Sequence, residues 1–142
     1  MSIWFAEPTL DALNAFSQAT LVEHLAIEFT AIGDDFITAR MPVDRRTVQP
    51  YGLLHGGASV VLAETLGSMA ANLCVDPTEK MCVGLEINAN HIRSARSGYV
   101  FGTVRPLHIG GNTHIWQTQI VDEKERLICI SRLTIAVLDQ KS

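Results

Sequence analysis

The sequence is poor in several features that define whole classes of protein. Only 18% of its residues are charged and its net charge is −4 at pH 7, whereas a general nucleic-acid-binding protein usually carries a basic excess. Its three cysteines are odd in number and have no C-x-x-C spacing, so we expect no disulfide framework. No H-E-x-x-H motif occurs, and the histidines lack a ligand spacing. We therefore expect no metal and no cofactor.

Long apolar runs are also missing. No apolar stretch approaches the roughly 18 residues that a membrane-spanning helix needs. The first residues, MSIWFAEPTLDAL, lack the basic start of a secretion signal. We therefore expect a cytoplasmic protein with no membrane contact and with reduced cysteines. No linker, repeat or low-complexity segment divides the 142 residues, so 1–142 is interpreted as one domain.

Hydrophobic periodicity predicts one long helix among strands. Apolar residues recur at helical spacing over 58–75, and the opposite side of that helix is also small or apolar, which is typical of a buried helix. Tight turns join neighbouring strand-like runs, which favours antiparallel pairing. The predicted fold class is α+β, with a long central helix wrapped by a curved antiparallel sheet. Short helices are expected after Thr9 and over 21–25, and strands over 25–30, 36–43, 81–92, 99–108, 113–121 and 127–138.

The last predicted strand, 127–138, is apolar on both alternations. An antiparallel sheet normally turns one polar face to water, so a strand apolar on both faces indicates that both are covered. The helix would cover one face, and a neighbouring subunit is a candidate for the other. The pattern therefore favours an oligomer.

Glu64 is the only charged residue within the long helix. Ionised groups are rarely buried without a partner, so Glu64 is a candidate catalytic acid. A structural ion pair, or a helix face open to solvent, would also explain it. Ser68 follows at i+4 and should lie beside it. Gly67 indicates either a ligand passing close to the helix or tight packing on the sheet.

The run His55-Gly56-Gly57 immediately precedes this helix. The first N–H groups of a helix are unpaired and its dipole favours negative charge there, so this segment could act as an oxyanion hole. Gly57 and Glu64 are about two turns apart, or about 10 Å along the axis. Both groups of one subunit are then too far apart to hold the same atom, unless Glu64 reaches back. A site shared between two subunits would resolve this.

These residues form a recognisable pattern, Gln49-x5-His55-Gly56-Gly57-x6-Glu64-x3-Ser68. The pattern resembles that of the hotdog-fold acyl-CoA thioesterases. The stretches MPVDRRTVQPYGLLHGGASVVLAETLGS and VGLEINANHIRSAR look closest to the bacterial 1,4-dihydroxy-2-naphthoyl-CoA and enterobactin-pathway proofreading thioesterases. The resemblance implies a hotdog fold and hydrolysis of acyl-CoA, or of an acylated carrier protein, to free acid and thiol.

The resemblance also implies a role for each residue of the pattern. Glu64 would be the catalytic carboxylate, as nucleophile or as general base for water. Gly56 would donate its backbone N–H to the thioester carbonyl, and His55 would help to hold that carbonyl. Gln49 would position substrate or water, and Ser68 would hydrogen-bond the acid or its water. In this family, paired chains build each active site at a dimer interface.

Substrate binding is predicted for a second group of residues. Gly57 would let the acyl group approach the start of the helix. In the resembled proteins, the strand that holds His91 lines the cleft, so His91 could contact an aryl hydroxyl or the thioester. Arg93 or Arg96 could pair with a CoA phosphate, although a solvated strand end is the simpler interpretation for either arginine.

Three alternatives stay open at this point. A hotdog hydroxyacyl dehydratase would pair His55 with Glu64 and release an enoyl thioester instead of a thiol. A non-catalytic acyl-CoA-binding protein would bind the thioester without releasing CoA. The oligomer could be a dimer or a tetramer, and the doubly apolar last strand favours the homotetramer. The resemblance points to aromatic acyl groups and to menaquinone biosynthesis.

Overall fold

The computed structural model describes residues 1–140 and contains three helices and six strands. Among these residues, no helix is both long enough and apolar enough to cross a membrane. The helices are α1 (Leu10–Phe16), α2 (Leu21–His24) and α3 (Gly56–Leu73), and the strands are β1 (Glu28–Ile32), β2 (Ile37–Pro42), β3 (Lys80–His91), β4 (Tyr99–Ile109), β5 (Thr113–Val121) and β6 (Leu127–Asp139).

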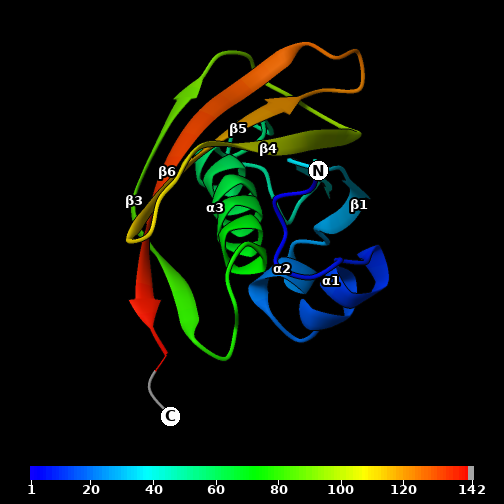
Figure 1. The fold of residues 1–142 in the computed structure, drawn as a ribbon. Coiled ribbons are helices and arrows are strands. Elements are labelled where there is room, and N and C mark those ends of the chain that lie inside the picture. The colour runs from blue at the N-terminus through cyan, green and yellow to red at the C-terminus, as the bar shows by residue number, and fades with distance from the viewer. Residues whose placement is uncertain (141–142) are drawn as a thin grey trace.

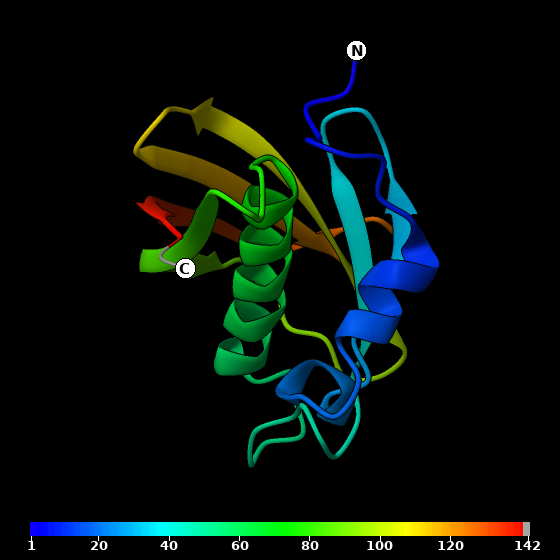
Figure 2. The same ribbon diagram turned by 60° about the horizontal axis from the view of Figure 1, so that its bottom comes forward.

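The strands form one sheet in the order β1-β2-β4-β5-β6-β3, and every neighbouring pair is antiparallel. The sheet curves around α3, which lies along its concave side (Figures 1 and 2). The short helices α1 and α2 lie near β1, at one edge of the sheet, whereas β3 forms the other edge. The predicted architecture, a long helix wrapped by a curved antiparallel sheet, is confirmed.

Helix α3 begins at Gly56, two residues before the predicted start, and ends at Leu73. His55 is the N-cap, and its Nδ1 accepts a hydrogen bond of 2.7 Å from the Gly57 N–H. The prediction missed this start because glycines interrupt an apolar pattern and because histidine is not among the preferred N-cap residues. The predicted N-cap of α1 is confirmed, since the Thr9 side chain accepts from the Ala12 N–H at 3.2 Å.

Two glycines let α3 approach the sheet closely. A Cβ added at Gly67 would lie 2.5 Å from Cδ2 of Leu133 on β6. A Cβ added at Gly102 on β4 would lie 2.8 Å from Cδ1 of Leu66 on α3. A helix glycine that faces the sheet in this way is explained by packing. Of the two interpretations of Gly67, the structure therefore supports tight packing rather than passage of a ligand.

Helix α3 is buried on the side that faces the sheet and partly open on the other. Leu62 and Leu66 have no exposed surface, whereas Glu64, Ser68 and Met69 are half-buried. The expectation of a helix buried all round therefore holds only for its sheet-facing side. Because the side that carries Glu64 is less covered, it can line a cavity.

Strand β6 shows a related difference between its two faces. Cys129, Leu133 and Ile135 face α3 and are buried. On the other alternation, Ile130 is half-buried and Arg132 is exposed. Within one chain the second face is thus only partly covered, and the oligomer inferred from this strand stays a prediction.

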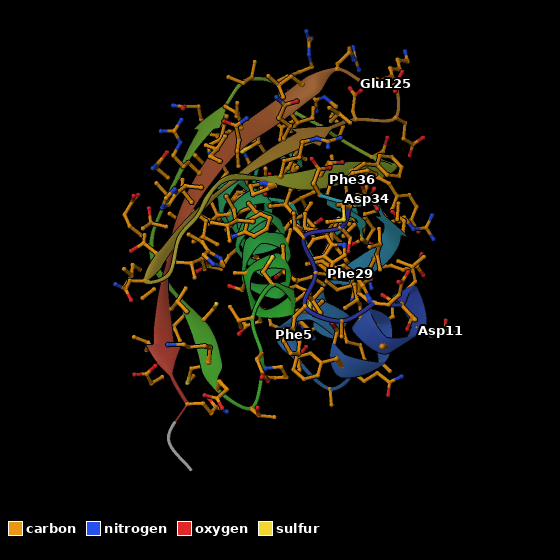
Figure 3. The ribbon with its side chains drawn as sticks, in the orientation of Figure 1. Phe5, Asp11, Phe29, Asp34, Phe36 and Glu125 are labelled. Carbon is orange, nitrogen blue, oxygen red and sulfur yellow. The ribbon has the colours of Figure 1, made fainter. Side chains whose placement is uncertain are left out.

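Asparagine side chains fasten both edges of the sheet to helices. Asn14 of α1 accepts from the Phe29 N–H at 2.8 Å and donates to the Phe29 carbonyl at 3.1 Å. Asn72 of α3 accepts from the Cys82 N–H at 2.9 Å and donates to its carbonyl at 3.1 Å. Each amide thus pairs with the backbone of an edge strand, β1 or β3. Phe29 is a residue of β1, and its buried ring lies in the interior (Figure 3).

Candidate active site

A first cavity, of about 300 Å³, lies at the start of α3. Gln49, Gly56, His91 and Arg93 line it together, so the fold brings four of the predicted residues to one place. A Cβ added at Gly56 would lie 2.8 Å from Nε2 of His91. Because the His91 ring lies against the backbone here, glycine is the residue that fits at position 56.

The N–H groups of Gly56 and Gly57 differ in whether they are already hydrogen-bonded. The Gly57 N–H is already bonded to Nδ1 of His55, which makes His55 a helix cap in this structure. Within residues 1–140 the Gly56 N–H donates to no protein acceptor. The first N–H of a helix carries the positive end of its dipole. Of these two glycines, Gly56 and not Gly57 therefore has a free backbone N–H at the cavity.

Gln49 borders the same cavity from the loop before α3. Its backbone carbonyl accepts from Gly52 and its backbone N–H donates to Leu53, while its side-chain oxygen accepts from the Tyr51 N–H. These bonds hold the side chain by its oxygen and leave the amide N–H groups as donors. Gln49 can therefore present a donor to a bound group near Gly56.

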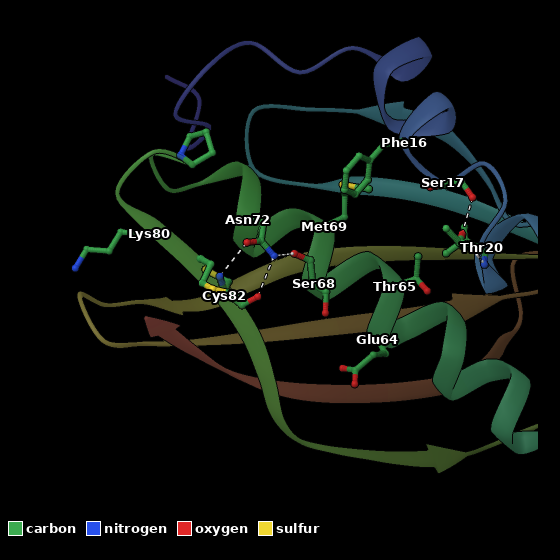
Figure 4. Close-up of a pocket in the computed structure, with 13 residues that line it drawn as sticks. Phe16, Ser17, Thr20, Glu64, Thr65, Ser68, Met69, Asn72, Lys80 and Cys82 are labelled. Atoms are coloured by element: carbon green, nitrogen blue, oxygen red, sulfur yellow. Dashed lines mark hydrogen bonds between the residues drawn. The ribbon is translucent and has the colours of Figure 1, made fainter. Parts of the chain in front are cut away.

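A second cavity, of about 650 Å³, lies along the partly open side of α3 (Figure 4). Glu64 and Ser68 line it from α3, as do Met69 and Asn72. The opposite wall comes from the α1–α2 region, which contributes Phe16 among others. Apart from Glu64 and Lys80 every lining residue is uncharged, and the Lys80 ammonium is paired with Asp139.

The Glu64 carboxylate is unusually short of partners. Its Oε2 is the one buried side-chain nitrogen or oxygen within residues 1–140 that has no hydrogen-bond partner. A Cβ added at Gly84 of β3 would lie 3.2 Å from this oxygen, so the acid lies against the strand backbone. Burial raises the pKa of the Glu64 carboxyl above its ordinary value. An acid with a raised pKa and a free oxygen is suited to general-base or nucleophilic work.

The expected bond between Ser68 and Glu64 is absent from the described residues. The Ser68 carbonyl instead accepts from the Asn72 side chain at 2.9 Å. Both Ser68 and Glu64 line the second cavity, so Ser68 remains beside the acid as predicted. Its role toward the acid or a bound water stays a prediction.

The two cavities share no lining residue. Glu64 lines one and Gly56 lines the other, as the spacing of about two helical turns led us to expect. Arg93 borders the Gly56 cavity, whereas Arg96 is exposed and lines neither cavity. One chain therefore places the Glu64 carboxylate and the Gly56 N–H on the same helix but not around the same space.

Sequence reasoning missed three residues of the Glu64 cavity and its surroundings. Gly84, beside the acid, stands at a β-bulge in β3, between Gly84 and Glu86. Asn72 fastens β3 to the helix, and Phe16 comes from a distant segment. A glycine inside a strand pattern was the one available signal, because such glycines often mark bulges or close backbone approach. The other two contacts depend on the tertiary fold.

The comparisons with known proteins show the family of the chain. The family model described as the thioesterase superfamily matches residues 51–129, a segment that includes Gly56, Glu64 and His91. The chain belongs to this superfamily and has its hotdog fold; it is a thioester hydrolase.

Individual relatives are similar over nearly their whole length. The chain is 58% identical to the 1,4-dihydroxy-2-naphthoyl-CoA hydrolase of Escherichia coli, over 96% of this chain and 99% of that protein. It is 54% identical to the proofreading thioesterase EntH of Cronobacter turicensis, over 96% and 98% of the two chains. A crystal structure of a mutant of the thioesterase PA1618 from Pseudomonas aeruginosa superposes with a TM-score of 0.97 at 50% identity, covering 98% of this chain and 100% of that one.

Proposed function

We propose that the protein hydrolyses aromatic acyl thioesters of CoA, and that Glu64 and the Gly56 N–H act on the same thioester from two different chains. The observation that carries the proposal is the complementarity of the two cavities. One holds a buried carboxylate oxygen without a donor, and the other holds a backbone N–H without an acceptor. Pairing two copies so that these cavities meet would give both groups a common ligand.

The reaction follows from these two groups. The thioester carbonyl oxygen accepts from the Gly56 N–H, which stabilises the negative charge that develops there. Glu64 then acts in one of two ways. It attacks the carbonyl carbon and expels the CoA thiolate, leaving an anhydride that water hydrolyses, or it takes a proton from a water that attacks instead. Both routes end in the free acid, the CoA thiol and a restored carboxylate.

Substitution of the acid tests its role. Glu64→Ala should lower thiol release from benzoyl-CoA by about 10³-fold or more. The fold should persist, because Oε2 makes no hydrogen bond that the variant would lose. Thiol release is followed with a disulfide reagent, and folding by circular dichroism. Full activity in the Glu64→Ala variant would remove Glu64 from the mechanism.

The two-chain site is tested by complementation. Glu64→Ala and Gly56→Ala chains are each purified, mixed, unfolded and refolded together. In a mixed dimer one site has Gly56 from the first chain and Glu64 from the second, both intact. Random pairing of two chains should then restore about a quarter of wild-type activity. A mixture no more active than its components would show that each site lies within one chain.

The choice between the two chemical routes can be made with heavy-oxygen water. In the anhydride route, water attacking the anhydride can leave a labelled oxygen in the Glu64 carboxylate after several turnovers. In the general-base route, label enters only the product acid. Label in the peptide that contains Glu64, detected by mass spectrometry, would establish the anhydride route, because the general-base route leaves Glu64 unlabelled.

The aromatic acyl group is proposed on the relatives' names and on the apolar cavity. The Escherichia coli relative is named as a hydrolase of 1,4-dihydroxy-2-naphthoyl-CoA, and a substrate of that kind would place this protein in menaquinone biosynthesis. The Cronobacter relatives are named as proofreading thioesterases, so an acylated carrier protein is a second substrate to assay. A panel of aryl and straight-chain thioesters on both carriers would rank these substrates.

We further propose a homo-oligomer built on this pairing. Strand β3 is an edge strand that exposes large apolar side chains, with Leu85 63% and Met81 41% accessible. Such an edge is open to pairing with another chain. The partly covered second face of β6 favours a tetramer over a dimer. Light scattering of the purified protein would determine the number of chains.

A further inference from the structure

A third cavity, of about 320 Å³, lies behind the Glu64 cavity. Nine of its ten lining residues have apolar side chains, and Asn72 is the exception. Ala12 and Leu13 of α1 contribute to one wall, and Leu73 of α3 to another. A volume of this size is at the lower end of that found for small-molecule sites. We call this space the rear chamber.

The rear chamber adjoins the Glu64 cavity, and the two spaces share a wall. Phe16, Met69, Asn72 and Pro77 line both spaces. Figure 4 shows Phe16 and Met69 at the side of the Glu64 cavity away from the acid. Phe16 is 79% exposed although it borders two cavities, and methionine is the most adaptable of the large apolar side chains. A wall made of these two side chains can therefore yield to a ligand.

Three polar side chains along this route, those of Ser17, Thr20 and Asn72, already have hydrogen-bond partners in the chain. The Asn72 amide bonds to the backbone of Cys82 and to the Ser68 carbonyl. The hydroxyl of Ser17 donates to the Leu13 carbonyl, and that of Thr20 donates to the Ser17 carbonyl. An apolar group that passes these residues breaks no protein hydrogen bond. Beyond Glu64, the route thus favours hydrocarbon over polar ligands.

We infer that the rear chamber receives the far end of the substrate's acyl group, so that the enzyme favours acyl groups whose apolar part extends past Met69. The inference rests on the proposed function, because it takes the Glu64 cavity as the place where the thioester reacts. The substrates favoured by this arrangement are thioesters of an aromatic or other acyl group that carries an apolar tail.

The test uses benzoyl-CoA and a series of its derivatives with para-alkyl tails of growing length. Each methylene buried in the chamber should raise kcat/KM by about four-fold, equivalent to about 0.8 kcal/mol. Ala12→Phe fills the rear chamber without touching the Glu64 cavity, since Ala12 lines only the chamber. Ala15→Phe is the matched control, because Ala15 is an exposed alanine of the same helix that lines neither space.

The expected result is a rise with tail length in the wild type and in Ala15→Phe, and its loss for the longer tails in Ala12→Phe. Unsubstituted benzoyl-CoA should be hydrolysed equally by all three proteins, which also shows that Ala12→Phe folds. If that variant does not fold, Ala6→Phe fills the same chamber from the N-terminal segment.

Two results would overturn the inference while leaving the proposed function intact. One is a wild-type kcat/KM that does not rise with tail length. The other is an Ala12→Phe profile that matches the wild type. Failure of the proposed function looks different, because benzoyl-CoA itself would then release no thiol, or would release it equally in Glu64→Ala.

Discussion

The two cavities along α3 differ in what they offer a substrate. The one at the helix start presents donors, the Gly56 N–H and the Gln49 amide, beside an exposed His91. The one along the middle of the helix presents an acid in apolar surroundings, with Oε2 of Glu64 unpaired. The cavity at the helix start has no acid among its lining residues, and the Glu64 cavity is not lined by Gly56 or Gln49. In the proposed pairing the two cavities are halves of one site, and each half can be damaged separately.

After removal of the Glu64 carboxylate itself, the largest effect on activity is expected at the helix start. In Gly56→Ala the new methyl group would lie 2.8 Å from Nε2 of His91. It would therefore displace the ring and occupy the space that a carbonyl oxygen needs. We expect kcat for benzoyl-CoA to fall by about 10²-fold, near the loss found when an oxyanion donor is removed.

Gly111→Ala is the matched control for that variant. A Cβ at Gly111 would meet nothing within 4 Å, so its kinetics should equal those of the wild type. Near-normal turnover in Gly56→Ala would mean that the helix start is not where the carbonyl binds, and the donor half would lose its assignment.

A smaller effect, on stability and on KM, is expected when Asn72, which holds β3 to α3 near Glu64, is replaced. Asn72→Ala removes the two hydrogen bonds that hold the backbone of Cys82 in β3 to α3. Because the buried Cys82 backbone would lose its partner, the free energy of unfolding should fall by about 1–3 kcal/mol. KM for benzoyl-CoA should also rise, since β3 carries Gly84 against Glu64.

Asn14→Ala provides the comparison at the opposite edge. It removes the equivalent pair of bonds to Phe29 of β1, which does not border either cavity. Urea denaturation should show a similar loss of stability in both variants, while KM should change only in Asn72→Ala. Equal kinetics in the two variants would contradict a positioning role for Asn72.

The smallest effect is a pH dependence of stability that comes from Glu64. Burial raises the pKa of this carboxyl in the folded chain above its ordinary value of 4.5. Between those two values the folded state binds more protons than the unfolded state, so the free energy of unfolding falls as pH rises. Above the folded pKa the cost of the buried charge is fully present.

Glu64→Gln should therefore gain stability relative to the wild type as pH rises through that window. Below the ordinary carboxyl pKa the wild-type acid is neutral in both states, and the two proteins should be equally stable. Urea denaturation of both proteins from about pH 4 to about pH 8 measures the difference. A constant difference over the whole range would mean that folding does not perturb the titration of Glu64.

Local patterns in the sequence predicted most of the secondary structure. The alternation over 113–121 coincides with β5, and the run over 127–138 falls one residue short of the end of β6. These elements were predictable because the helical and strand periods are set by residues close in the chain. The start of α3 was wrong by two residues, because His55 acts as an unexpected cap. Glu64 was found because a lone acid in an apolar helix is conspicuous.

The tertiary contacts of the site were beyond such patterns. That β3 pairs with β6, about 50 residues away, decides that Gly84 lies against Glu64 and that His91 lies against Gly56. That α1 packs beside β1 decides that Phe16 borders both the Glu64 cavity and the rear chamber. In each case the contacting residues are far apart in the chain, so helical or strand periodicity in the sequence does not reveal that they meet.

The sequence by itself therefore determined most of the element types and the family pattern, and it singled out Glu64 as the candidate acid. Only the tertiary structure decided that Gly57 is already bonded to His55 while Gly56 is free, and that Gly67 serves packing. It alone placed an apolar chamber beside the Glu64 cavity, behind Met69. The physical reason is that composition and spacing fix what a segment prefers, whereas burial and hydrogen-bond partners are properties of segments brought together by folding.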